Sequence, residues 1–176
     1  MSESRTGSLA AAIERTVSGL TRTPERGRLT RTVTARLRDG VTCDIEAGGH
    51  TFVADFPEGA GGGNLGPTPS ELLSGAVASC LVIGWALWAA RLGVPLDALE
   101  ITVETDLDTR GLYGLDDSIA PGHTGVRCVT VVRSAAPPDR LRELAATVER
   151  VSPLLDDLRR SVAVTTDLRV ASRTDD

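Results

Sequence analysis

Lysine is absent from this chain of 176 residues, so all 19 basic side chains are arginines. The absence excludes a lysine Schiff base and a lysine general base as the chemistry of an active site. Acidic side chains number 24 and give a formal net charge of -5, so the sequence has no electrostatic footprint for nucleic acid or an anionic membrane. The function therefore has to come from a localised site.

Cysteine and histidine are also scarce. Cys43, Cys80 and Cys128 lie far apart, with no CxxC pair and no nearby histidine, which argues against a zinc site and a disulfide framework. His50 and His123 fall in predicted loops without paired Asp or Cys neighbours, so neither has the setting of a triad base. We expect no metal and no other bound cofactor.

The N-terminus lacks a basic segment followed by a long apolar core, so it does not resemble a secretory signal. An odd number of free thiols agrees with a reducing compartment. We expect a cytoplasmic protein with three segments: a helical extension and connector over 1–27, one domain over 28–170, and a polar tail over 171–176. Within the extension, an apolar stripe begun by Ser8 predicts an amphipathic helix over 8–20.

Strand-like alternation appears in four parts of the domain. The first, 28–56, contains the turn sequences Asp39-Gly40 and Gly48-Gly49 and predicts a three-stranded meander. The others predict single strands over 99–105, 126–133 and 162–170. The polar, glycine-rich stretch 109–125 is long enough to cover a site.

The longest predicted helix begins at Thr68, which forms a capping box with Glu71 and precedes Pro69 at the first helical position. The run 72–92 has few polar side chains and is long enough to span a bilayer. We interpret it as a core helix, because the flanking strands need their apolar faces covered; a membrane span is the alternative. The preceding loop 58–67 lacks the glycine patterns of phosphate cradles and is predicted to be flexible.

A second helical region begins at Pro137-Pro138, is interrupted at Ser152-Pro153 and continues as a short turn. Three strings, GGGNLGPTPSELLSGAVASC, LTRTVTARLRDG and ERVSPLLDDLRRSVAV, occur in this order of elements. Over about residues 28 to 170 the chain resembles the OsmC/Ohr family of osmotically induced and organic hydroperoxide resistance proteins. The resemblance implies an α+β fold, in which two long buried central helices, one per chain, pack on strands in an intertwined homodimer. An apolar helix without a polar face supports this independently, because such a helix must be covered on all sides.

In that family a reactive cysteine midway along the central helix reduces peroxides. An arginine of the first hairpin and a glutamate at the helix start assist it, and a second cysteine before a later proline resolves the sulfenic acid. The resemblance places the reactive thiol on Cys80 and the arginine on Arg38. The acidic position is Ser70, with Glu71 one residue along, and the resolving position is Ser152. Two of the four expected groups are therefore substituted.

The residues themselves leave several roles open. Cys80 lies well inside an apolar helix and would be an inert core thiol unless a cation such as Arg38 stabilised its thiolate. Arg38 is otherwise a solvated hairpin residue, and Glu71 is otherwise only a capping residue. Cys128 is a possible substitute for the resolving thiol, whereas Cys43 is interpreted as packing.

An apolar pocket is the last candidate feature. Trp85 and Trp88 lie on the central helix beyond Cys80, and with Leu112 and Tyr113 they can wall such a pocket or simply fill the core.

The leading hypothesis is a thiol-dependent, peroxidase-like homodimer that reduces organic hydroperoxides through Cys80 and is regenerated by an external thiol. In one alternative Cys80 attacks a different electrophile. In the other the protein is a non-catalytic module that binds an apolar small molecule. Neither a nucleic acid nor a membrane is an expected partner.

Overall fold

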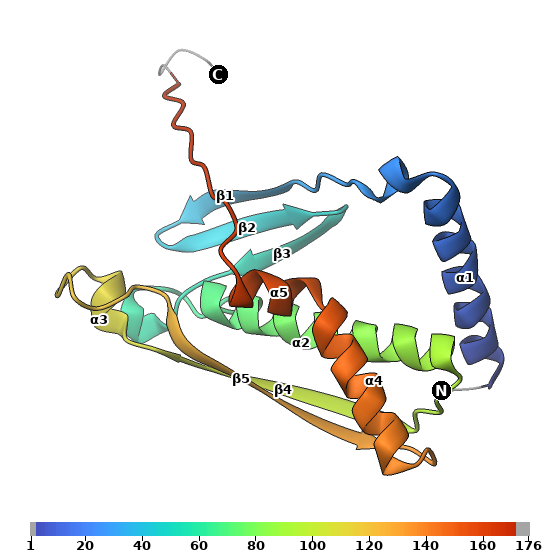
Figure 1. Ribbon diagram of the computed structural model, residues 1–176. Helices are drawn as coiled ribbons and strands as arrows, with labels where there is room; N and C mark the ends of the chain where they lie inside the picture. The colour runs from blue at the N-terminus through green and yellow to red at the C-terminus, as the bar shows by residue number, and fades with distance from the viewer. Residues whose placement is uncertain (1–2, 172–176) are drawn as a thin grey trace.

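The computed structural model of the chain describes residues 3–171, and Figure 1 shows how its helices and strands are arranged. In chain order the elements are α1 (Glu3–Arg22), η1 (Pro24–Gly27), β1 (Val33–Asp39), β2 (Thr42–Ala47), β3 (His50–Ala54), η2 (Glu58–Ala60), α2 (Pro69–Leu92), β4 (Ala98–Leu107), α3 (Thr109–Leu112), β5 (His123–Arg133), α4 (Pro138–Val151) and α5 (Pro153–Arg159). The fold is mixed α and β, as predicted, with α2 between a two-stranded and a three-stranded sheet (Figure 1).

Local chemistry sets both ends of α2. The Thr68 hydroxyl accepts a hydrogen bond from the Glu71 backbone while the Glu71 carboxylate accepts one from Thr68, so the predicted capping box is present. Gly93 closes the helix in the left-handed region, at φ 65°, where glycine carries no Cβ penalty. A helix of 24 residues results.

The hydrophobic core lies between α2, α4 and one face of the β4–β5 sheet. Val77, Leu81 and Trp85 of α2 pack with Leu144 and Val148 of α4, and all five are nearly inaccessible to solvent. The alternate residues of β4 and β5 that pack on this cluster are Leu99, Ile101, Val103, Cys128 and Val132. The period-two prediction for 99–105 is confirmed in β4, the strand predicted over 126–133 is present as β5, and both strands are longer than predicted.

In one copy of the chain α2 is buried on one face only. Val82, Ile83 and Leu87 on its other side are exposed, Ile83 to 58%. By length and composition α2 is able to cross a membrane, but core helices of soluble proteins pass the same test. The packing of its buried face on α4 and the β4–β5 sheet favours the core interpretation.

The predicted meander is confirmed as the antiparallel sheet β1–β2–β3. Its first strand is exposed along its whole length, and the sheet has no extensive contact with another helix or strand. Leu37 is 75% exposed as a result. In a single chain this sheet lacks the apolar cover that a three-stranded sheet needs.

The strand predicted over 162–170 is wrong for the single chain. The segment leaves α5 as an extended, exposed stretch that joins no sheet (red in Figure 1). Its apolar residues alternate as in a strand, and Val164, Leu168 and Val170 are each more than 80% exposed. Alternation creates an apolar face, but a strand also needs a partner edge, and this segment has none in one copy.

Helix α1 extends beyond the predicted 8–20 and packs against the C-terminal part of α2 (Figure 1). Arg91 of α2 pairs with Glu14 of α1 at 3.6 Å. The same guanidinium lies over the Trp88 ring, 4.9 Å from its centroid. These contacts join the N-terminal extension to the central helix.

Candidate functional site

The thiol of Cys80 lies next to the hydroxyl of Ser152, with 3.5 Å between Sγ and Oγ. Cys80 is midway along α2, and Ser152 occupies the junction between α4 and α5. Ser152 is 5% exposed and Cys80 is partly buried. The structure thus brings together the reactive and the resolving positions that the sequence suggested.

Packing between α2 and α4 creates this contact. Gly84 allows the close approach, because a Cβ there would lie 3.1 Å from a methyl group of Val148. Pro153 directly after Ser152 disfavours continuation of α4, since the residue before a proline avoids helical backbone angles. Ser152 is indeed extended, and it also caps α5 by accepting a hydrogen bond from the Leu155 backbone at 3.4 Å. The side chain is therefore fixed at the level of Cys80.

Cys128 is a partly buried residue of β5. It faces the core cluster and lines a cavity of about 740 Å³ together with Trp85 and His123. Burial raises the pKa of its thiol, and the nearby Glu149 carboxylate raises it further. All three cysteines are free thiols, and over residues 3–171 the structure records no disulfide or hydrogen bond between Cys128 and Cys80. A raised pKa makes Cys128 a poor nucleophile at neutral pH.

Both histidines begin strands, so the prediction that they lie in loops is wrong. His50 begins β3 and is exposed, whereas His123 begins β5 and is partly buried. The Nε2 atom of His123 is buried and has no hydrogen-bond partner among the described residues. Within those residues no cluster of three or more His, Cys, Asp or Glu side chains could hold a metal ion.

Arg38 is held by its own hairpin. Its Nε donates to Asp44 Oδ2 at 3.0 Å, and its terminal nitrogen pairs with the other carboxylate oxygen. This hydrogen bond raises the pKa of Arg38 and lowers the pKa of Asp44. No contact between Arg38 and Cys80 is recorded within one chain over residues 3–171. The Asp44 partnership was missed in the sequence, although opposite charges flanking a tight hairpin turn are its signal.

Glu71 makes only the contacts of a helix cap. Its carboxylate accepts hydrogen bonds from the backbone and the hydroxyl of Thr68, at 2.7 and 2.9 Å. These bonds, the backbone one first, lower the pKa of Glu71. The structure records no contact of Glu71 with Arg38 or Cys80 in the part of the chain that it describes.

The four residues proposed to wall one pocket are not brought together in a single chain. Trp85 is buried in the core, whereas Trp88 lines a separate groove of about 340 Å³ between α1 and α2. Leu112 and Tyr113 are 55% and 60% exposed and line neither cavity. The two tryptophans are neighbours on α2 and Trp88 also packs against the core cluster, but each lines a different cavity.

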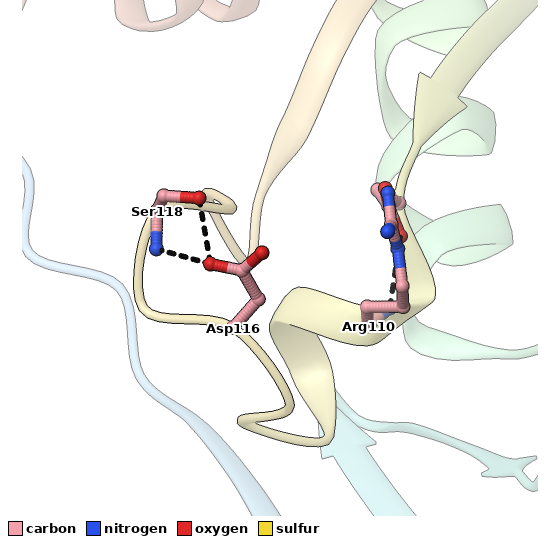
Figure 2. A network of polar contacts seen from close by, with 4 residues as sticks. Arg110, Asp116 and Ser118 are labelled. Atoms are coloured by element: carbon pink, nitrogen blue, oxygen red, sulfur yellow. Dashed lines mark hydrogen bonds and ion pairs between the residues drawn. The ribbon is translucent and has the colours of Figure 1, made fainter.

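The long segment 109–125, which contains Leu112, is held by hydrogen bonds among its own residues and with Asp108. Asp108 caps the short helix α3 and pairs with Arg110. Asp116 accepts hydrogen bonds from the backbone and the hydroxyl of Ser118, at 2.9 and 2.6 Å (Figure 2). The structure records no hydrogen bond or ion pair between these side chains and Cys80.

A buried carboxylate that sequence reasoning missed organises the glycine-rich loop. Asp55 follows β3, is 1% exposed, and accepts hydrogen bonds from the backbones of Phe56, Gly63 and Leu65 at 2.8, 2.9 and 3.1 Å. The loop predicted to be flexible thus has its backbone amides bound to a side chain of the protein itself. An acidic residue between a strand and a glycine-rich run was the available signal.

We expect Asp55 to make the stability of the protein depend on pH in the acid range. Burial alone would raise the pKa of Asp55, but the backbone donors of Leu65, Phe56 and Gly63 outweigh it and the pKa is lowered. A lowered folded-state pKa gives stability that is present above the unfolded value of about 4 and is lost as the pH falls below it. Asp55→Asn should therefore lower the melting temperature at pH 7.

The same substitution should flatten the decline in melting temperature between pH 5 and pH 2, measured by circular dichroism. Asp117→Asn is the matched control, because Asp117 is exposed and makes no contact that the structure records. An unchanged acid slope in Asp55→Asn would contradict the assignment.

The family model for OsmC-like proteins matches residues 61–167. Among solved structures, an OsmC-like protein from Mycoplasma pneumoniae has a TM-score of 0.66 at 16% identity, over 76% of this chain and 89% of that one. An organic hydroperoxide resistance protein from Elizabethkingia anophelis has a TM-score of 0.59 at 15% identity, over 76% and 91%. The comparison with curated proteins finds no match. Identities this low show the shared fold alone.

Proposed function

Because the chain belongs to the OsmC-like protein family, we propose that it reduces organic hydroperoxides through the thiol of Cys80, acting as a homodimer. The observation that carries the proposal is the 3.5 Å contact between Cys80 and Ser152. It supports the assignment, taken from the family resemblance, of Cys80 to the reactive position and of Ser152 to the resolving position. A structural neighbour is named an organic hydroperoxide resistance protein, which supports the substrate class.

The proposed reaction begins with attack of the Cys80 thiolate on the distal oxygen of the hydroperoxide. A sulfur–oxygen bond forms, the oxygen–oxygen bond breaks, and the alkoxide leaves as an alcohol after taking up a proton. Ser152 cannot form a disulfide, so an external thiol attacks the sulfenic acid and releases water. A second external thiol then attacks the mixed disulfide, releases the Cys80 thiolate and forms a disulfide with the first external thiol. The two electrons therefore come from two thiol molecules.

The second copy in this proposal is supported by the exposed surface of one chain. A compact monomer of 18.5 kDa exposes about 8,200 Å² by the relation between surface and mass, whereas this chain exposes 13122 Å². The apolar face of α2 and the β1–β3 sheet contribute to the excess. Two copies that cover these surfaces reciprocally form a closed assembly, and the family resemblance implies that Arg38 of one copy lies near Cys80 of the other. The partner guanidinium stabilises the thiolate.

A dimer of about 37 kDa, twice the mass of one chain at 18.5 kDa, is therefore expected in sedimentation experiments. Ile83→Asp should shift the protein to monomer, because it places a charge on the uncovered face of α2. Ala135→Asp is the control, since it adds the same charge at an exposed turn. A monomeric wild type, or one that partitions into membranes, would contradict the proposal.

The function is tested by peptide mapping after a brief pulse of organic hydroperoxide. We expect sulfenic acid at Cys80, the sulfinic form in excess peroxide, and no intramolecular disulfide. Turnover should depend on added small thiols. Ser152→Cys should allow a disulfide to Cys80, because the two side chains already touch.

Other outcomes of this experiment distinguish the alternatives. A Cys80 to Cys128 disulfide would show that the resolving residue has moved, and the single-thiol cycle would be wrong. An acyl or alkyl adduct on Cys80 would identify a different electrophile as substrate. If Cys80 carries neither an oxidation product nor an adduct, the remaining hypothesis is a non-catalytic binding module. The free thiols suit a reducing compartment, so the proposal includes a cytoplasmic location.

A further inference from the structure

The hydroxyl of Ser152 has one proton to donate and two lone pairs to accept. One lone pair is used, because the Leu155 backbone donates to Oγ at 3.4 Å. Among the residues that the structure describes, the other hydrogen-bond partner of this hydroxyl is Cys80 Sγ at 3.5 Å. A thiolate can only accept, so when Cys80 is ionised the proton of Ser152 points to the sulfur.

The surroundings favour this hydrogen bond. Ser152 is 5% exposed, so water competes little for its hydroxyl, and the cap of α5 holds the oxygen in place. Within one chain, the structure records no charged side chain in contact with the Cys80 sulfur over residues 3–171; the charged group proposed to act on this sulfur is Arg38 of the other copy in the homodimer. The charged groups nearby on α4 and α5, Glu149 and Arg159, act on Cys128.

We infer that Ser152 is a positioning residue whose hydroxyl donates a hydrogen bond to the Cys80 thiolate and stabilises it. The inference rests on the proposed function, because that reaction begins from the thiolate. A hydrogen bond to an ionised acceptor is stronger than one between neutral groups, so the anion gains more than the thiol. The position that faces the reactive sulfur therefore serves the reduced state of Cys80 instead of resolving its oxidised state.

Three variants separate the hydroxyl from the helix cap. Ser152→Gly removes the hydroxyl, yet glycine is itself an acceptable N-cap, so α5 is retained. Ser152→Thr keeps both the hydroxyl and the cap. Ser79→Ala removes the hydroxyl next to Cys80 in sequence, which donates to the Ala76 carbonyl at 3.0 Å, and is the matched control.

The measurement is the rate of Cys80 alkylation by iodoacetamide as a function of pH. Mass spectrometry of the Cys80 peptide separates it from Cys43 and Cys128. We expect Ser152→Gly to slow alkylation at pH 7 about tenfold and to move the profile to higher pH, with the rate at alkaline pH unchanged. Ser152→Thr and Ser79→Ala should stay within about twofold of the wild type.

A wild-type profile in Ser152→Gly would overturn the inference. So would a lower rate at every pH, which would indicate altered access to the sulfur, or a wild-type Cys80 that is not alkylated at any pH. Peroxide turnover is measured separately on the same proteins. If the alkylation profile of Ser152→Gly is shifted but the wild type does not turn over peroxide, the role of Ser152 is retained and the proposed function is rejected. If the wild type turns over peroxide but the profile of Ser152→Gly is not shifted, the proposed function is retained and the role of Ser152 is rejected.

Discussion

Replacing Cys80 by serine should abolish the reduction of organic hydroperoxides, with a loss of at least about a thousandfold. The thiolate is the group that attacks the peroxide oxygen, and a serine hydroxyl of the same size is not ionised at neutral pH. The fold should be unaffected, because Cys80 is only partly buried and its replacement preserves the volume of the side chain. The measurement is the consumption of tert-butyl hydroperoxide in the presence of excess dithiothreitol.

Cys43→Ser is the matched control for this experiment. Cys43 lies on β2, opposite Leu37 of β1 and Ala54 of β3, and makes no contact with the α2 thiol that the structure records. Its replacement should leave turnover within about twofold of the wild type. Equal losses in Cys80→Ser and Cys43→Ser would defeat the assignment of Cys80.

Gly66→Ala should destabilise the protein by at least about 3 kcal/mol. A Cβ at this position would overlap the Val53 carbonyl oxygen and lie 2.8 Å from its carbon. That carbonyl belongs to β3, where Val53 is paired with Asp44 of β2, so the backbone has little room to yield. The loop around Asp55 would have to leave the sheet, and its hydrogen bonds would be lost with it.

Urea denaturation followed by circular dichroism measures this effect. Gly59→Ala is the control, because a Cβ there meets no atom within 4 Å. The control should lie within about 0.5 kcal/mol of the wild type. If the two variants had similar stability, the close approach of the loop to β3 would not contribute to folding.

The central helix and the strands that flank it were predictable because local chemistry determines them. The Thr68 capping box, Gly93 at the helix end and the period-two pattern of 99–105 act within a few residues of chain. The family resemblance supplied the link between Cys80 and Ser152. Periodicity could not supply it, because the two positions are 72 residues apart and meet only through tertiary packing.

Other features were missed because they depend on several distant groups. The strand pattern places Asp55 at the end of a strand, yet the groups that donate hydrogen bonds to it are backbone amides up to ten residues away. The resemblance predicts that Arg38 acts on Cys80, whereas within one chain its side chain pairs with Asp44 of the neighbouring strand. The alternation over 162–170 predicts a strand with one apolar face. It does not predict which strand, in the same chain or in another copy, this segment would pair with.

The intrinsic fluorescence of the two tryptophans can report on two separate parts of this chain. Trp85 is 4% exposed inside the core, so its emission follows unfolding of the whole domain. Trp88 lies beneath the Arg91 guanidinium in the groove that α1 covers. Detachment of α1 changes the polarity around Trp88 and leaves Trp85 in place. A fluorescence transition that precedes loss of the core would therefore measure how tightly the N-terminal helix holds the central one.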